Sequence, residues 1–243
     1  NLINNQIVNI KNAMFFFTTK ELLDISNCNS IDCFVNQNSI NVIINCAAYT
    51  DVDKAEEDEA SADNINNKAL KYLAKISKEK SIKLIHISTD YVFDGKNYQP
   101  YKENDGTNPQ GVYGQTKLSG EKAMSDINPS NSIIIRTSWV YSSFGNNFVK
   151  TMLKLGQQKD ELGVIFDQVG TPTYARDLAK IILEIIPKIQ NNKVEIYHYT
   201  NEGVLSWYDF AKEIMKMSKL KCKINPLETY QYPTPASRPN YSV

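Results

Sequence analysis

Three tyrosine–lysine pairs have the spacing of an acid–base couple on one helix face: Tyr113/Lys117, Tyr98/Lys102 and Tyr208/Lys212. Residues four apart are neighbours on the surface of an α-helix. A nearby cation favours the ionised phenolate and lowers a tyrosine pKa that is otherwise about 10. Such a phenol can donate the proton that a carbonyl takes up as it becomes an alcohol. Because the chain has 14 tyrosines and 27 lysines and arginines, chance pairs are expected and the surrounding sequence must choose.

The surroundings of two pairs argue against chemistry. Pro100 lies within the Tyr98 pair and disfavours a helical turn there. The Tyr208 pair lies in an amphipathic segment, so Tyr208 is expected to pack and Lys212 to face water.

Tyr113 has a different context. It follows a turn that contains Pro109 and Gly111, and it begins a predicted helix. It also lies 24 residues after Thr89, which ends a predicted buried strand. We therefore predict that the Thr89 hydroxyl, the Tyr113 phenol and the Lys117 ammonium converge as catalytic groups.

Short apolar runs supply the elements that would position these residues. The segments 41–48, 82–88 and 131–138 are continuous and rich in β-branched residues, which is typical of strands covered on both faces. Between the first two lies a segment with helical spacing, 61–80, in which Ile65, Leu70, Leu73, Ala74 and Ile76 can share a face. Strands that alternate with helices predict an α/β fold with a Rossmann-like, doubly wound parallel sheet.

The strand ends carry small and hydroxyl-bearing residues. The three segments are Ala47-Ala48-Tyr49-Thr50, Ser88-Thr89-Asp90 and Arg136-Thr137-Ser138. In open α/β sheets, ligands bind beyond the carboxyl ends of the strands. These residues are also good turn formers, so the ligand-binding and the purely structural interpretations both stay open.

The character of the sequence changes after residue 138. The segment 139–156 is rich in aromatic residues, and two more helices are predicted, one starting near Asp177 and one with Ser206 as N-cap. We interpret residues 1–137 as a cofactor-binding Rossmann domain. Residues 138–243 are interpreted as mainly a smaller substrate-binding lobe, with some elements returning to the first domain.

Composition excludes several classes of function. The 27 basic and 27 acidic residues cancel, which gives no global reason to expect nucleic acid or an anionic membrane as partner. No apolar stretch approaches the roughly 18 residues of a membrane span. The cysteines lack paired CxxC spacing, so we expect reduced thiols in a cytoplasmic protein; they are Cys28, Cys33, Cys46 and Cys222. The acidic stretch 51–63 fits a solvated helix start better than a metal site, although Asp53 could reach the second lobe.

Seven motifs, in order along the chain, carry a family resemblance: NCAAYTDVDKAE, STDYVFDG, YGQTKLSGE, RTSWVY, GNNFVKTM, DQVGTPT and SRPNYSV. On the basis of these motifs, the chain from about Phe15 to Val243 resembles the dTDP-4-dehydrorhamnose reductase family of extended short-chain dehydrogenases/reductases. The resemblance implies hydride transfer from NADPH or NADH to the C4 ketone of the nucleotide sugar dTDP-6-deoxy-L-lyxo-4-hexulose, which gives dTDP-L-rhamnose. A homodimer is a possible assembly, and Mg²⁺ is a possible ion that the sequence does not support.

The resemblance also implies roles for individual residues. Tyr113 would donate the proton to the new hydroxyl, Lys117 would bind the nicotinamide ribose and lower the pKa of Tyr113, and Thr89 would contact the carbonyl oxygen. Three groups of residues would bind the ligands. Asp24 and Ile25 would contact the adenine, and the rest of the cofactor would be lined by Ala47, Ala48, Tyr49 and Ser88. Asp90 and Trp139 would contact the sugar nucleotide.

Several residues have both a functional and a structural interpretation. The guanidinium of Arg238 suits a nucleotide diphosphate, yet it could be a surface arginine in a proline-rich tail. Trp139 could stack on the ligand or simply pack. Asn66 could anchor a backbone carbonyl or a water, or it could equally cap a helix or pack. His86 and His198 are expected to be satisfied core histidines.

Two other classes of function stay open. One is a non-catalytic regulatory subunit of the same fold, like the methionine adenosyltransferase β subunit, and the other is a nucleotide-sugar epimerase or dehydratase. The joint presence of Thr89, Tyr113 and Lys117 favours an enzyme over the regulatory subunit, and the STDYVFDG and DQVGTPT stretches favour the reductase.

The sequence departs from the family pattern in one respect. The family opens with a strand and a GxxGxxG turn that holds the pyrophosphate, whereas this sequence has no such motif and its first ten residues, NLINNQIVNI, resemble the end of the following helix. Loss of a central strand would expose an unpaired sheet edge. We therefore expect the natural chain to extend further at both ends; an intact mass of 27.6 kDa would contradict this expectation.

Overall fold

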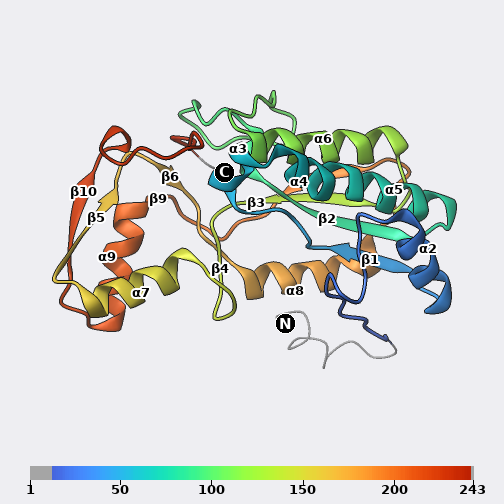
Figure 1. Ribbon diagram of the computed structural model, residues 1–243, viewed down its shortest axis with the longest axis horizontal. Helices are drawn as coiled ribbons and strands as arrows, with labels where there is room; N and C mark the ends of the chain where they lie inside the picture. The colour runs from blue at the N-terminus through green and yellow to red at the C-terminus, as the bar shows by residue number, and fades with distance from the viewer. Residues whose placement is uncertain (1–12, 242–243) are drawn as a thin grey trace.

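A four-stranded parallel sheet forms the centre of the first lobe. The computed structural model describes residues 13–241 (Figure 1), so the segment NLINNQIVNI and Val243 lie outside the described residues. The sheet order is β1-β2-β3-β8, and every neighbouring pair is parallel. Its strands are β1 (Val42–Asn45), β2 (Lys83–Thr89), β3 (Ile133–Thr137) and β8 (Glu195–His198). The three strands predicted from apolar runs are thus confirmed, and the predicted α/β class with them.

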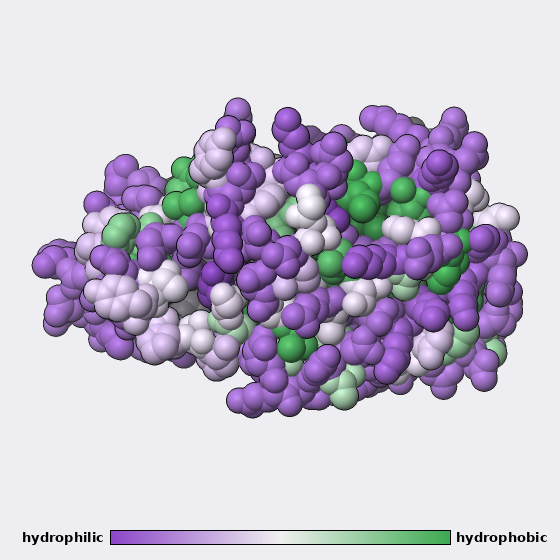
Figure 2. Space-filling view, turned by 90° about the horizontal axis from the view of Figure 1, so that it is seen from above, coloured by the Kyte–Doolittle hydropathy of each residue, from purple (hydrophilic) through white to green (hydrophobic). Residues whose placement is uncertain are grey.

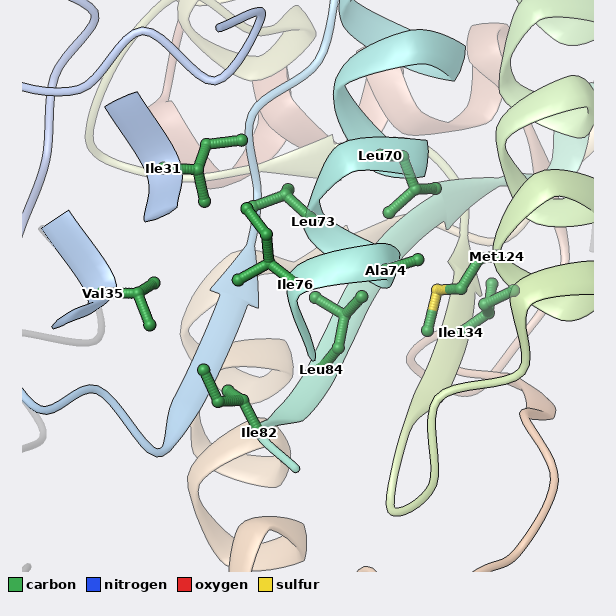
Figure 3. Packing of buried hydrophobic residues seen from close by; sticks show 10 residues of the cluster. All are labelled: Ile31, Val35, Leu70, Leu73, Ala74, Ile76, Ile82, Leu84, Met124 and Ile134. Carbon is green, nitrogen blue, oxygen red and sulfur yellow. The ribbon is translucent and has the colours of Figure 1, made fainter. Parts of the chain in front are cut away.

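Helices cover both faces of this sheet (Figure 1). On one face pack α2 (Cys28–Gln37), α5 (Ala69–Glu79) and α6 (Val112–Ile127), and on the other packs α8 (Ala175–Ile185). Figure 3 shows the first core, in which Leu70, Leu73 and Leu84 lie between α5 and the sheet. The second core joins Ile85, Ile133 and Ile135 to the apolar stripe of α8. This double cover explains why the strand sequences are continuously apolar.

The helical segment before β2 is interrupted. It consists of α3 (Val52–Glu57), α4 (Glu59–Asp63), the π-helical turn η2 (Asn64–Lys68) and α5. Helix α6 packs against η2 at Gly120, where a Cβ atom would overlap the carbonyl oxygen of Asn66. The predicted shared face is confirmed for Leu70, Leu73, Ala74 and Ile76, which are buried, while Ile65 is half-buried.

A second lobe lies beside the carboxyl ends of the sheet strands. Its core is formed by α7 (Phe148–Gln158) and α9 (Trp207–Ser218) against the parallel pair β5 (Glu161–Ile165) and β10 (Lys223–Leu227). Ser206 caps α9 in a capping box with Asp209, as predicted. The short elements are η3 (Asp90–Val92), β4 (Val140–Tyr141), β6 (Val169–Gly170), β7 (Thr173–Tyr174), η4 (Ile186–Lys188), β9 (Leu205–Ser206) and η5 (Thr229–Gln231).

The surface is mainly polar. Figure 2 shows the face that carries α3 to α6, where hydrophobic side chains are visible in small separate patches. Within residues 13–241, no helix has the length and apolar character to cross a membrane. The same residues contain no group of three or more histidines, cysteines or acidic residues arranged to hold a metal ion. All four cysteines are free thiols.

Candidate active site

Thr89 and Tyr113 meet where β2 ends and α6 begins. Thr89 is the last residue of β2, and Tyr113 is the second residue of α6. A hydrogen bond joins their side chains. The α6 N-cap, Gly111, has no side chain, and the Glu56 carboxylate of α3 instead accepts a bond from the Val112 amide at 2.8 Å. The start of α6, and with it the Tyr113 phenol, is thereby fixed.

The pKa of Tyr113 is not lowered as the sequence led us to expect. Burial raises it to about 12, the hydrogen bond with Thr89 opposes this shift, and the negative charge of Asp90 adds to it. Removing a phenolate from water costs more than the single hydrogen bond returns. Tyr113 is therefore held firmly as a protonated phenol, which is the form that can donate a proton.

Lys117 lies one helical turn further along α6 and is buried, with an exposed fraction of 1%. Its Nζ donates to the carbonyl oxygen of Ile87 at 2.7 Å and lies 3.0 Å from Nε2 of His86. Burial lowers the pKa of Lys117 to about 8, although the carboxylate of Glu121 acts in the opposite direction. An amine with a pKa close to neutrality can take up or release a proton under ordinary conditions.

The other two tyrosine–lysine pairs have the local structure that the sequence predicted. Tyr98 is 85% exposed and lies outside any helix. In the third pair, Lys212 is exposed and its Nζ lies 5.1 Å from the ring centre of Tyr208 on α9. The predictions for both pairs are confirmed, since one is irregular and the other is a packed tyrosine with a solvent-facing lysine.

Behind Lys117 lies a buried polar cluster from four elements, which consists of Asn45, His86, Ser88, Lys117, Glu121 and Arg136. The Arg136 guanidinium donates through Nε and Nη2 to the two carboxylate oxygens of Glu121, at 3.0 and 2.7 Å. The Ser88 hydroxyl donates to the same carboxylate. Asn45 contacts His86, which contacts Lys117. A fork-to-carboxylate pair of this kind is the geometry that best compensates two buried charges.

The residues that follow β1 form the part of the sheet edge at which the sequence predicted cofactor binding; we call this segment, residues 47–49, the cofactor edge. Ala47 and Ala48 follow the strand, and the Asn66 side chain binds the backbone of Tyr49 through both its N–H (2.9 Å) and its carbonyl (3.2 Å). Asn66 also donates to the Thr116 hydroxyl at 3.1 Å. The Tyr49 hydroxyl is buried and has no hydrogen-bond partner among the described residues. Small residues, an unsatisfied hydroxyl and a buried lysine fit a bound nicotinamide nucleotide here.

Asp24 and Ile25 lie further from these groups, in the turn that precedes α2. The Asp24 carboxylate accepts bonds from the Ser26 amide at 2.9 Å and from its hydroxyl at 2.7 Å. Ile25 packs against the core between α2 and the sheet. Both contacts order the turn.

On the side of the second lobe, Trp139 and Arg238 already have protein partners. Trp139 has a positive φ of 46° and stacks on Trp207 with ring centres 3.4 Å apart. Arg238 forms an ion pair with Asp53 at 2.7 Å, and Asp53 also accepts from the Ala236 amide. Asp53 therefore reaches the C-terminal segment, as the sequence suggested, and ties it to the start of α3.

Comparison with known proteins places the chain in a family. Residues 4–243 match the family model of the RmlD substrate binding domain. The chain belongs to this family. It is 43% identical to a dTDP-4-dehydrorhamnose reductase of Aggregatibacter actinomycetemcomitans, over 89% of this chain and 76% of the relative.

Solved structures of the same kind superpose closely on this RmlD family member. A dTDP-4-dehydrorhamnose reductase of Clostridium acetobutylicum has a TM-score of 0.93 and 44% identity, covering 99% of this chain and 84% of that one. A Bacillus anthracis enzyme of the same name, in complex with NADP, has a TM-score of 0.92 and 36% identity, covering 98% of this chain and 85% of that one. The resemblance drawn from the seven motifs is confirmed.

Sequence reasoning missed part of the buried polar cluster behind the candidate site of this RmlD family member. Glu121 and Arg136 were not singled out as a pair, and Asn45 was not singled out at all. A weak signal existed, because Glu121 lies four residues after Lys117 on the same helix face and Arg136 interrupts an apolar strand. His86 was predicted to be a satisfied core histidine, which its two side-chain contacts confirm. For His198 the same prediction is wrong in part, because its Nε2 is buried without a partner among the described residues.

Proposed function

We propose that this protein reduces the C4 ketone of dTDP-6-deoxy-L-lyxo-4-hexulose to dTDP-L-rhamnose with NADPH or NADH, for cell-surface polysaccharide synthesis. The observation that carries the proposal is the junction of β2 and α6, where Thr89 is bonded to Tyr113 and Lys117 lies one turn deeper. The names of the similar enzymes, and the NADP bound to the Bacillus anthracis one, support the substrate and the cofactor.

The proposed roles follow from the state of each side chain. When bound, the nicotinamide nucleotide supplies the hydride. Tyr113, a protonated phenol, donates its proton to the carbonyl oxygen as negative charge develops there. The Thr89 hydroxyl positions that oxygen. Lys117 binds the nicotinamide ribose, and protonation of its amine stabilises the Tyr113 phenolate that remains.

We propose the ligand-binding residues in two sets. Residues 1–137 bind the cofactor and residues 138–243 supply mainly the substrate-binding lobe. The cofactor set is Asp24, Ile25, Ala47, Ala48, Tyr49, Ser88, Tyr113 and Lys117. The substrate set is Thr89, Asp90, Trp139 and Arg238. For Trp139 and Arg238, binding requires that the nucleotide sugar replaces or joins the contacts with Trp207 and Asp53.

The test is oxidation of reduced cofactor in the presence of the nucleotide-sugar ketone, measured for wild type and for Tyr113→Phe. We expect Tyr113→Phe to lower kcat by about 10²–10⁴-fold, because it removes the proton donor. Tyr208→Phe is the matched control, since it changes the same residue type in the same spacing outside the site, and it should keep full activity. Equal activity of the two variants would contradict the role of Tyr113.

The same assay separates the alternatives. A regulatory subunit would bind cofactor, measured by nucleotide fluorescence, without consuming it. An epimerase or dehydratase would return the cofactor to its starting state, so product would form without net oxidation. The free thiols of all four cysteines support a cytoplasmic location, and the homodimer stays a prediction that light scattering can check.

A further inference from the structure

A line of three buried side chains leads from the end of β1 to the Lys117 amine. Asn45 Nδ2 lies 3.0 Å from Nδ1 of His86, and Nε2 of His86 lies 3.0 Å from Nζ of Lys117. The exposed fractions of the three residues are 4%, 1% and 1%. Both contacts are therefore shielded from bulk solvent, and the position of each hydrogen is set by the neighbouring protein groups.

The amide of Asn45 determines which imidazole nitrogen carries the proton. Its Oδ1 accepts a bond from the Ala47 backbone N–H at 3.2 Å, so its NH₂ group is the one that faces His86. Nδ1 of His86 must then act as acceptor. His86 is neutral, because burial and then the charge of Lys117 hold its pKa well below the usual value. A neutral imidazole has one hydrogen, so that hydrogen is on Nε2.

This tautomer restricts the state of Lys117. The Nε2–H of His86 points at Nζ, which already donates to the carbonyl oxygen of Ile87 at 2.7 Å. An ammonium group has three donors and no acceptor, whereas a neutral amine has one lone pair. The arrangement described by the structure is therefore satisfied when Lys117 is a neutral amine.

We propose that His86 is a positioning residue whose tautomer couples the protonation of Lys117 to the hydrogen bond between Asn45 and the Ala47 amide. When Lys117 gains a proton, Nε2 of His86 must become an acceptor, and the imidazole hydrogen moves to Nδ1. Nδ1–H then requires an acceptor, so the Asn45 amide turns and its Oδ1 leaves the Ala47 N–H. The total number of protons changes by one, on Lys117.

Loss of the hydrogen bond from the Ala47 amide would affect the proposed cofactor edge, because Ala47 is the first of the residues assigned to that edge. Protonation of Lys117 and the geometry of the Ala47–Tyr49 segment would thus change together. This functional meaning rests on the proposed reductase activity, whereas the tautomer coupling itself does not. The charged or titratable groups near this line are Glu121 on α6, which is paired with Arg136 of β3, and the thiol of Cys46 after β1.

The first test is nitrogen-15 NMR of the protein with labelled histidine, which reports the tautomer of each ring. The chain has two histidines, so His198→Gln assigns the signals of His86. Between about pH 7 and about pH 10 we expect His86 to stay neutral while its hydrogen shifts from Nδ1 to Nε2, with a midpoint near the Lys117 pKa of about 8. The shift should vanish in Lys117→Met and persist in Cys46→Ser.

A hydrogen that stays on Nδ1 throughout this range, or a tautomer that does not respond to pH, would overturn the proposal. Because this measurement needs neither substrate nor turnover, it stands even if the reductase activity is not found.

The second test is the pH profile of kcat in His86→Gln. Glutamine can offer an oxygen to the Lys117 ammonium, so we expect the alkaline limb to move to higher pH by roughly one unit. His198→Gln is the control and should leave the limb in place. If His86 had only a packing role, kcat would fall equally at every pH, and this result would contradict the coupling.

Discussion

The two lobes bury different kinds of side chain. Beneath the candidate active site, the first lobe encloses a full ion pair, a lysine and a histidine, all with exposed fractions of 3% or less. The core of the second lobe contains apolar and aromatic residues, among them Met152, Ile214 and Met215. Trp139 and Trp207 stack at its boundary.

This difference indicates that the first lobe holds its side chains in fixed positions, whereas the second lobe can adjust its packing. Buried charges are stable only in one arrangement, because each donor and acceptor must keep its partner. The groups proposed to be catalytic therefore lie on elements that cannot shift without breaking those bonds. Apolar contacts are not directional, so the second lobe can adjust to a ligand at lower cost. Tyr113 and Lys117, which we propose to take part in the reaction, lie in the first kind of region, and Trp139, which we propose to contact the sugar nucleotide, borders the second.

The largest expected effect comes from breaking the ion pair. Arg136→Met leaves the Glu121 carboxylate buried without its partner, and we expect the free energy of unfolding to fall by about 3–5 kcal/mol. Urea unfolding measures this change. The double variant Arg136→Met/Glu121→Leu should recover much of the loss, because no unpaired charge remains. A single variant as stable as wild type would show that the first lobe does not depend on this pair.

A cavity in the second lobe should act through apolar packing alone. Ile214→Ala removes buried methylene and methyl groups in α9 and should lower the free energy of unfolding by about 2–5 kcal/mol. Both tryptophans lie at this lobe, so tryptophan fluorescence follows its unfolding. Unlike the loss caused by Arg136→Met, the stability loss of this variant should be unchanged by salt. A strong dependence on salt would contradict the view that the second lobe is held together by apolar packing alone.

The buried lysine predicts a dependence of stability on pH. The pKa of Lys117 is about 8 in the folded protein and 10.5 without burial, so between these values the unfolded chain binds more protons. The free energy of unfolding should then rise with pH, by on the order of 1 kcal/mol per unit. Tyr113 acts oppositely only above pH 10. The rise should be absent in Lys117→Met and present in Lys212→Met.

The smallest expected effect belongs to the contact between the lobes. The Asp53–Arg238 pair is partly exposed, so Asp53→Asn should cost less than about 1 kcal/mol in stability. If Arg238 binds the nucleotide diphosphate, the same change should alter KM for the nucleotide sugar and leave kcat nearly constant. A change in kcat alone would instead place Asp53 in the chemistry.

The sequence predicted those features that depend on local pattern. Continuous β-branched runs identified three of the four strands of the main sheet, and the strand-end Thr89 with the turn before Tyr113 correctly predicted that Tyr113 begins a helix beside the end of β2. Contacts between distant residues were not predictable in this way. The Glu121–Arg136 pair and the Asp53–Arg238 pair join elements whose approach is decided by packing. The direction of the Tyr113 pKa also depends on burial, which spacing does not report.

The π-helical turn η2 has a consequence for how the chain tolerates changes in length. There the Ala69 amide bonds to the Asn64 carbonyl five residues back, so this turn holds one residue more than an α-helical turn. The extra residue rotates everything before it by about 100° relative to α5. Deleting Ile65 would remove the extra residue and rotate the segment before it relative to Asn66, so the hydrogen bonds between Asn66 and Tyr49 would be lost although neither residue is removed. The turn thus carries one residue more than a regular helix at the point where the Asn66 amide binds Tyr49 on the proposed cofactor edge.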